Sequence, residues 1–309
     1  DSSGTGWWDV GRRAWSDARP DKVVPVSGED LRERWVEELA DLGFVAPSRP
    51  RQVASVRPGE LDRDALVETA LTRLGARRSA WNPADARGEV EKLIASAGVV
   101  VDGSVRRELA EDLAARVLEA SQPLLGRNDA PEHIRVLTSP QVLSVERELV
   151  TRIARRADAA TITVVEGAAG SGKTRRLAAE RAQVEARGGR MLVVTPTRKA
   201  AQVASGEVGA AAHSVAWLLH QHGYRWDEDG RWGWVAPAPD APRLDRRTVL
   251  VVDEAGMLDQ DTARALLELA DTTGTPLILV GDRHQLPAVG RGGVLDLAAR
   301  YAPDRCVEL

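Results

Sequence analysis

The sequence predicts an α/β fold, in which a parallel sheet is flanked by helices and preceded by a small helical region. Short, almost wholly apolar runs alternate with longer segments in the second half of the chain, as expected of parallel strands buried on both faces. Apolar residues recur every three or four positions in the first half, which is typical of amphipathic helices. A glycine-rich turn, VVEGAAGSGKT from Val164 to Thr174, follows the first apolar run, and the other motifs are arranged around it.

Composition describes an ordinary globular chain, with 43% apolar and 28% charged residues. Because 309 residues slightly exceed what one core usually supports, we expect two domains. The net charge of −4 argues against a strongly basic nucleic-acid binder but permits a local basic groove. Cys306 is the single cysteine, which suits a reducing, cytoplasmic location. No apolar run approaches the ~18 residues that span a bilayer, and the first residues lack the basic and apolar regions of a signal peptide.

A helical accessory domain is expected over residues 29–125, after an irregular lead-in over residues 1–28. Apolar stripes indicate four helices, and a glycine follows each of the first three where a helix would stop: residues 31–42, 61–74, 90–97 and 105–117. Ser104 is expected to cap the fourth helix by accepting a backbone N–H. We interpret the mixed charges on these helices as solvated surface rather than a binding surface.

A linker is expected over residues 126–140, which are punctuated by glycine and proline. Ser139 before Pro140 is typical of a helix start with proline at the first helical position. Residues 141–309 then form the second domain, with these predicted strands: residues 161–165, 191–195, 248–252 and 277–280. Ligands of such sheets bind at the carboxyl ends of the strands, and each motif below follows a strand.

The glycine-rich turn matches the pattern G-x-x-x-x-G-K-[ST] of phosphate-binding loops. In such a loop the backbone N–H groups surround the phosphates, the lysine reaches the β and γ phosphates, and the hydroxyl binds Mg²⁺. Lys173 and Thr174 hold the last two positions. The whole candidate loop comprises Gly167, Ala168, Ala169, Gly170, Ser171, Gly172, Lys173 and Thr174. The alternative is a surface turn that matches by chance, but a strand-like run before it and a helix-like segment after it are the context that the motif requires.

A second motif, VLVVDEAGM, places two adjacent carboxylates after an apolar strand. Asp253 would hold Mg²⁺ through water, and Glu254 would orient or deprotonate an attacking water. The alternative is an acidic helix start favoured by the helix dipole. A third motif, LILVGDRHQLP, brings Gln285 to the same edge of the sheet, where its amide can contact a γ-phosphate or the attacking water. Taken by itself, Gln285 is more simply a loop-stabilising amide.

The stretch GYRWDEDGRWGWV, from Gly223 to Val235, predicts a β-hairpin with its aromatic residues on one face. Exposed tryptophans there would stack bases of single-stranded DNA. We favour the alternative, in which these tryptophans pack on the core or on Trp217.

Taken together, the motifs resemble those of superfamily 1 DNA helicases of the RecD-like branch in both order and spacing. The segments that carry the likeness are GAAGSGKT, TPTRKAAQVA, AAHSVAWLL, VVDEAGM and GDRHQLPAVG. Within that branch the chain is most similar to the helicase part of the MobF-type conjugative relaxases, the TraA or TrwC-like proteins, particularly those of actinobacterial plasmids. LGARRSAWNPADARGEVEKLIA, TSPQVLSVE and GRGGVLDLA are similar too, so the likeness covers most of the chain from about residue 29.

The resemblance implies a RecA-like P-loop ATPase that uses ATP and Mg²⁺, as the first motor domain of a helicase. It makes Lys173 and Thr174 the phosphate and Mg²⁺ ligands, Asp253 and Glu254 the Mg²⁺ and water-activating pair, and Gln285 the γ-phosphate sensor. Single-stranded DNA is the implied partner, with movement in the 5′ to 3′ direction during conjugative transfer and contact with the conjugation machinery. The implied DNA-facing residues are Thr195, Thr197, Lys199 and His213. For His213 the alternative is a capping or core histidine.

Two features depart from the family pattern. Arg147, beside Glu146, has the position of a glutamine that reads adenine, so nucleotide selectivity is open. The chain lacks an initiator Met and ends at Leu309, where the family continues into a second RecA-like domain, so we expect a piece of a longer protein that binds Mg·ATP but translocates poorly by itself. The five histidines are scattered, so we do not expect a relaxase nicking domain in this piece. A non-catalytic nucleotide or DNA-binding module is the main alternative, and an unrelated P-loop ATPase switch is a third, against which GDRHQLP counts.

Overall fold

The computed structural model describes residues 28–44, 56–125, 131, 133–168, 170–197, 212–285 and 290–309. The chain divides into two compact units, Asp1–Val53 and Ala54–Leu309. The described part of the first unit is the helix α2 (Gly28–Asp41), which confirms the first predicted helix. Gly43, with φ +77°, follows α2. The apolar side chains of this segment are exposed: Trp35, Val36, Leu39, Leu42 and Phe44.

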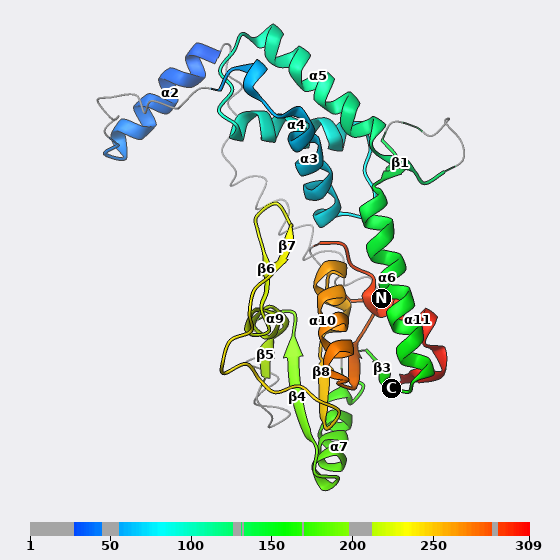
Figure 1. The fold of residues 1–309 in the computed structure, drawn as a ribbon. Coiled ribbons are helices and arrows are strands. Elements are labelled where there is room, and N and C mark those ends of the chain that lie inside the picture. The colour runs from blue at the N-terminus through cyan, green and yellow to red at the C-terminus, as the bar shows by residue number, and fades with distance from the viewer. Residues whose placement is uncertain are drawn as a thin grey trace, which may run out of the picture. The chain divides into compact units, whose positions relative to one another are not determined.

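The second unit begins with three helices that share one core (Figure 1). They are α3 (Arg63–Arg77), α4 (Pro83–Ser96) and α5 (Gly103–Glu119), preceded by the short helix η1 (Pro58–Glu60). Trp81 is fully buried in this core, and its indole N–H donates to Ser121 Oγ at 3.0 Å.

Two helix starts differ from expectation. The helix α4 begins seven residues before the predicted residue 90, at Pro83, because Asn82 and Asp85 form a capping box around a proline at the first position. The expected cap at Ser104 is wrong. The chain is already helical at Gly103, so Asp102 holds the N-cap position and Ser104 lies inside the first turn.

The sheet has six parallel strands in the order β10-β3-β9-β8-β4-β5. The four predicted strands are confirmed as β3 (Ile162–Glu166), β4 (Arg190–Thr195), β8 (Thr248–Val252) and β9 (Leu277–Gly281). Sequence reasoning missed β5 (Ala212–Ser214) and β10 (Cys306–Glu308), because three residues carry too little pattern to identify a strand. The α/β class with a parallel sheet, flanked by helices and preceded by a helical region, is therefore confirmed.

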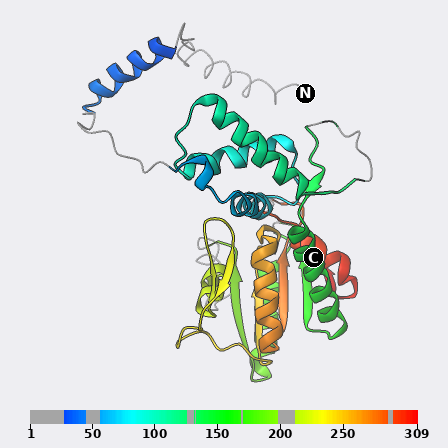
Figure 2. The ribbon, with the colours of Figure 1, turned by 45° about the horizontal axis from the view of Figure 1, so that its top comes forward.

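Helices cover both faces of the sheet. The inward side chains of α6 (Pro140–Asp158), α9 (Val215–Gln221), α10 (Gln260–Thr273) and α11 (Val294–Tyr301) share a core with one set of strand residues. The alternate strand residues face Leu177 of α7 (Lys173–Ala186). Figure 2 shows the orange helix α10 lying over the sheet with its axis along the strands, and the green helix α6 beside it. The start of α6 is as predicted, since Ser139 Oγ accepts from the N–H of Val142 at 3.2 Å and Pro140 is the first helical residue.

Smaller elements complete the unit. Just before the expected linker, β1 (Gln122–Pro123) pairs antiparallel with β2 (Leu137–Thr138), which lies inside it. The short helices η2 (Ala255–Met257) and η3 (Pro303–Arg305) follow β8 and α11. The predicted hairpin is confirmed as β6 (Tyr224–Trp226) and β7 (Trp232–Trp234), which pair antiparallel with Tyr224 opposite Trp234 and Trp226 opposite Trp232.

Candidate functional site

The glycine-rich loop connects β3 to the first residue of α7. Lys173 begins that helix, and its ammonium group donates to the carbonyl oxygens of Gly167 at 2.6 Å and Ala168 at 3.1 Å. Gly170 and Gly172 adopt φ +79° and +94°, which side chains rarely tolerate. The lysine therefore lies inside the curve of the loop, at a helix N-terminus. Ala169 lies outside the described residues.

The loop is shaped by its glycines. A Cβ on Gly167 would lie 2.3 Å from Ser171 Oγ, whereas the Cβ positions of Gly170 and Gly172 meet no atom within 4 Å. Ser171 Oγ is buried and has no hydrogen-bond partner among the described residues. An ammonium group and an unpaired hydroxyl at a helix N-terminus, with open space beside Gly170 and Gly172, fit a phosphate chain.

The two carboxylates of the second motif follow β8. The backbone N–H of Asp253 donates to Val194 O of the neighbouring strand β4 at 2.9 Å, and Asp253 Oδ1 accepts from the N–H of Glu254 at 3.0 Å. Glu254 has φ 57° and ψ 36°, a left-handed conformation that is costly for a residue other than glycine. Strain of this kind is concentrated at functional sites.

The third motif is held against the first two by the backbone. The N–H of Gly167 donates to Gly281 O at 3.1 Å, which joins the glycine-rich loop to the end of β9. A Cβ on Gly256 would lie 2.9 Å from Asp282 O, so the turns after β8 and β9 are in contact. Three motifs that are far apart in sequence thus meet at the carboxyl edge of the sheet, as the parallel topology requires.

Asp282 is the centre of the third turn. It accepts the backbone N–H of His284 at 2.9 Å and the side-chain amide of Gln285 at 3.2 Å. The His284 N–H, helped by Gln285 and by the charge of Lys173, lowers the pKa of Asp282 below its ordinary value. In this state, therefore, the Gln285 amide is used within its own loop, as the simpler interpretation expects.

Glu166 and Arg283 were not singled out from the sequence. Glu166 is the last residue of β3 and is buried, and its Oε1 accepts from Arg283 Nε at 2.6 Å. The Glu166 carboxylate raises the pKa of Arg283. This pair ties the third turn to the start of the glycine-rich loop. A charged residue in the last position of a buried strand was the available signal.

The residues expected to face DNA have different surroundings in the structure. Thr195 is fully buried, and its hydroxyl donates to Thr197 O at 2.7 Å, so it holds its own turn. His213, on β5, stacks on Trp217 with ring centroids 3.8 Å apart and an interplanar angle of 17°. It does not cap α9, because Ser214 is the N-cap residue. Lys199 lies outside the described residues.

Two neighbouring residues of α6 bear on nucleotide selectivity. Arg147 is exposed, and its carbonyl oxygen accepts from Thr151 Oγ1 at 2.8 Å. Glu146 Oε1 accepts from the buried Gln260 Nε2 at 3.2 Å. Neither contact shows that Arg147 or Glu146 recognises the base of a nucleotide.

The hairpin tryptophans divide into two kinds. Trp232 is partly buried and packs against the core of the sheet, with its ring centroid 5.0 Å from that of Trp226. Trp226 and Trp234 are 44% and 64% exposed. The preferred expectation that the tryptophans pack inward holds for Trp232 and is wrong for these two. The paired aromatic residues share one face of the hairpin, and the core of the sheet covers that face only at Tyr224 and Trp232.

Two features are absent from the residues that the structure describes. In that part of the chain, no group of three or more His, Cys, Asp or Glu side chains is arranged to hold a metal ion. Nor does any described helix combine the length and the apolarity needed to cross a bilayer.

Residues 146–309, more than half of the chain, match the family described as AAA domain. The chain belongs to this family. The match begins within α6 and includes the glycine-rich loop and both later motifs, so the AAA domain is a P-loop NTPase domain, and nucleotide binding follows from the family.

Part of this AAA domain chain is similar to conjugal transfer proteins. It is 34% identical over 146 residues to a probable conjugal transfer protein TraA of Sinorhizobium fredii, covering 47% of this chain and 12% of that protein. It is 31% identical over 134 residues to the conjugal transfer protein TraA of Agrobacterium fabrum, covering 43% and 11%. The chain thus spans about a tenth of the length of these relatives.

Among solved structures, the signal recognition particle receptor FtsY from Elizabethkingia anophelis aligns over 86% of this chain and 75% of that chain, with 11% identity and a TM-score of 0.23. That score is too low to relate the two folds.

Proposed function

We propose that this AAA domain is the ATP-hydrolysing part of a single-stranded DNA translocase, the first RecA-like motor domain of a MobF-type, RecD-like superfamily 1 helicase. The observation that carries the proposal is the meeting of three motif loops at one edge of the sheet, joined by the bond between Gly167 and Gly281. Residues 141–309 would be the motor domain, 29–125 an accessory helical domain and 126–140 their linker. The name of these relatives, conjugal transfer protein, supports a role in plasmid transfer.

The proposed chemistry assigns a task to each motif. When bound, Mg·ATP supplies a γ-phosphoryl group whose transfer to water needs charge neutralisation and a positioned nucleophile. Lys173 would exchange the carbonyls of Gly167 and Ala168 for phosphate oxygens. Thr174 and Asp253 would hold Mg²⁺, and Glu254 would orient the attacking water. Its left-handed backbone is the kind of strain that is concentrated at functional sites.

Gln285 would act as the γ-phosphate sensor. Its amide is held by Asp282 at 3.2 Å, and turning it toward a phosphate requires that bond to break. A Cβ on Gly290 would lie 3.0 Å from Ala76 O of α3, so a change in this part of the chain on hydrolysis would alter the contacts of the accessory helices. On the DNA side, Thr197, Lys199 and His213 would follow the strand, with movement in the 5′ to 3′ direction.

The decisive experiment is ATP turnover by the full chain with and without single-stranded DNA. We expect turnover that the DNA stimulates, and we expect Lys173→Ala to abolish it because no other group replaces the ammonium at the β and γ phosphates. Lys92→Ala is the matched control, since Lys92 is an exposed lysine of α4 outside the site. Turnover that persists in Lys173→Ala would contradict the assignment.

The second candidate is a non-catalytic module that binds nucleotide and single-stranded DNA. The observation that favours it is the closed arrangement of the Gln285 amide on Asp282 and of Lys173 on the loop carbonyls. Binding of DNA with no ATP turnover in the unsubstituted chain would select this candidate.

A further inference from the structure

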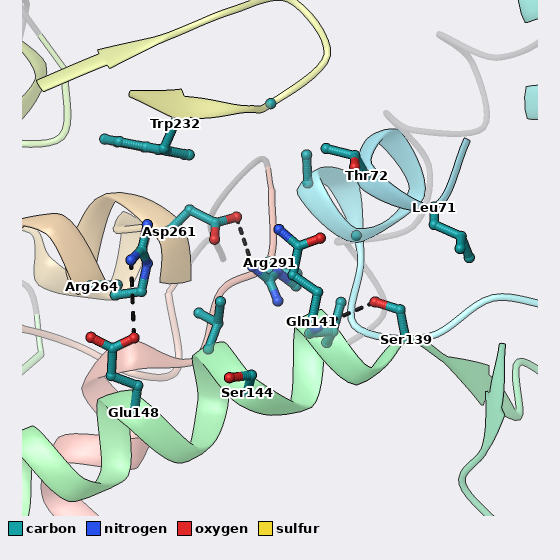
Figure 3. A pocket seen from close by; sticks show the side chains of 15 residues that line it. Leu71, Thr72, Ser139, Gln141, Ser144, Glu148, Trp232, Asp261, Arg264 and Arg291 are labelled. Atoms are coloured by element: carbon teal, nitrogen blue, oxygen red, sulfur yellow. Dashed lines mark hydrogen bonds and ion pairs between the residues drawn. The ribbon is translucent and has the colours of Figure 1, made fainter. Parts of the chain in front are cut away.

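A cavity of about 290 Å³ lies away from the phosphate-binding loop, between the accessory helix α3, the start of α6, the start of α10 and the hairpin (Figure 3). Trp232 lines it from the hairpin, and Ser144 and Glu148 line it from α6 (Figure 3). Its volume is at the low end of that of small-molecule sites, so it suits a ligand the size of one ring system.

A buried arginine, Arg291, lines the cavity. Its side chain is 3% exposed, and one nitrogen, Nη2, donates to Asp261 Oδ2 at 2.7 Å. The other two nitrogens, Nε and Nη1, are buried and find no acceptor among the residues that the structure describes, and the same holds for Nε of Arg264. Buried N–H groups without partners are destabilising. The cavity therefore favours a ligand that presents hydrogen-bond acceptors.

The carboxylates beside the cavity favour neutral ligands over anionic ones. Asp261 neutralises Arg291 at 2.7 Å, and Glu148 lies 4.0 Å from Arg264. A phosphate group in this space would face two carboxylates, so the cavity suits a neutral acceptor better than an anion. Trp232 adds an aromatic surface, and Val142 and Val145 add apolar ones. A flat, neutral ring with carbonyl or ring-nitrogen acceptors fits all of these groups.

The cavity adjoins a wider groove. A second hollow shares four lining residues with it and extends to Pro196, Thr197 and the exposed Trp226. The shared residues are Ala76, Gly230, Trp232 and Asp261. A single strand of DNA that lies in the groove near Thr197 would pass the hairpin tryptophans and bring a base to the mouth of the cavity.

We propose that this cavity receives one unstacked base of single-stranded DNA, held by the N–H groups of Arg291 and covered by Trp232. The proposal rests on the proposed function, since it requires the chain to bind single-stranded DNA. Arg291 and Trp232 are then base-contacting residues outside the ATP site, and bases with a ring carbonyl are the preferred occupants.

Photo-crosslinking tests the proposal on the full chain. The probe is a fluorescent dT12 oligonucleotide in which single thymidines are replaced by 4-thiothymidine, and crosslinked peptides are mapped by mass spectrometry. We expect one probe position to crosslink to the segment around Gln141 and Ser144 or to Trp232. Ser144→Trp fills the cavity, and it should remove this crosslink and weaken dT12 binding by about fivefold or more, the low end of what one stacked base contributes.

Two comparisons make the test decisive. Ser96→Trp, at the exposed end of α4, is the matched control and should bind dT12 normally. Arg291→Gln should also lose the crosslink, but this variant breaks the buried pair of Arg291 with Asp261. Ser144→Trp keeps that pair, so a loss of the crosslink in Ser144→Trp is not explained by the loss of the pair. Unchanged binding by Ser144→Trp, with crosslinks confined to Trp226 and Trp234, would overturn the proposal while leaving the proposed function intact. Failure of the unsubstituted chain to bind dT12 would overturn both.

Discussion

At the scale of single residues, the most demanding position outside the ATP site is Arg156, near the end of α6. Its side chain is 5% exposed, and burial lowers its pKa while Asp271 opposes that shift. Its Nε donates to Asp271 Oδ1 at 2.7 Å, and its Nη1 donates to the carbonyls of Thr161 and Thr275 at 3.2 and 3.1 Å. One guanidinium group thus joins the ends of α6 and α10 to the starts of β3 and β9.

Replacing this group should destabilise the fold. Arg156→Met keeps the side-chain volume but leaves Thr275 O without this donor and removes one partner of Asp271. We expect a loss of about 3 kcal/mol in the free energy of unfolding, the low end for a broken buried pair, because Arg152 still binds Asp271. Urea denaturation measures it. Arg155→Met, at the exposed neighbouring position, should change stability by less than about 0.5 kcal/mol. Equal stability of the two variants would show that Arg156 is not structural.

At the scale of elements, the hairpin β6–β7 depends on a glycine at its base. Gly223 has φ +92°, and its carbonyl oxygen accepts from the N–H of Val235 at 2.8 Å. A Cβ at this position would lie 2.0 Å from Val235 O, a backbone atom that cannot rotate away. The two hairpin strands can therefore approach at their open end only if this residue is glycine.

Gly223→Ala should therefore disturb the hairpin. We expect a loss of about 1–3 kcal/mol from the left-handed backbone and the clash. The contact between Trp226 and Trp232 should also weaken, which reduces the circular dichroism that paired indoles produce. Gly233→Ala is the matched control, because a Cβ there meets no atom within 4 Å. A Gly223→Ala protein with the stability and indole signal of this control would contradict the prediction.

At the scale of the whole molecule, the second unit is held together by contacts between the hairpin tip and α3. Asp229 Oδ1 accepts from Arg73 Nε at 2.7 Å, and Asp229 Oδ2 accepts from Arg231 Nη1 at 2.6 Å. Arg231 Nη2 donates to Thr69 Oγ1 at 2.6 Å, and a Cβ on Gly230 would lie 2.8 Å from Ala76 Cβ. Hydrogen bonding to Arg73 lowers the pKa of Asp229. The helical region and the hairpin therefore form one connected structure.

A double-mutant cycle on Arg73→Ala and Asp229→Ala measures this connection. Both side chains are about a quarter exposed. We therefore expect a coupling of about 1 kcal/mol in the free energy of unfolding, within the range for residues in contact. The control cycle pairs Arg73→Ala with Glu228→Ala, an exposed residue of the same tip, and should be additive. Additivity in the first cycle would mean that the tip and α3 are independent.

Much of this architecture could be predicted because the information is local. The strand before the glycine-rich loop, the cap at Ser139 and the hairpin are each specified by a few adjacent residues. The predictions fail where a strand is too short to show an alternating pattern, or where two nearby residues can both hold the N-cap position of a helix. Three-residue strands such as β5 carry no periodicity. The N-cap residue of α5 is Asp102, two residues before the predicted Ser104.

The α/β class and the three motifs can be predicted from local sequence, because strand and loop chemistry depends on neighbouring residues. Which distant groups meet depends on how the whole chain packs. Glu166 binds Arg283, and Arg73 binds Asp229, although these residues are remote in the chain. Packing also leaves two donors of Arg291 buried without an acceptor among the described residues. Which of the hairpin tryptophans are buried was likewise fixed by the surface on which the hairpin packs. Burial and long-range pairing are properties of packed neighbours, and a local pattern does not contain them.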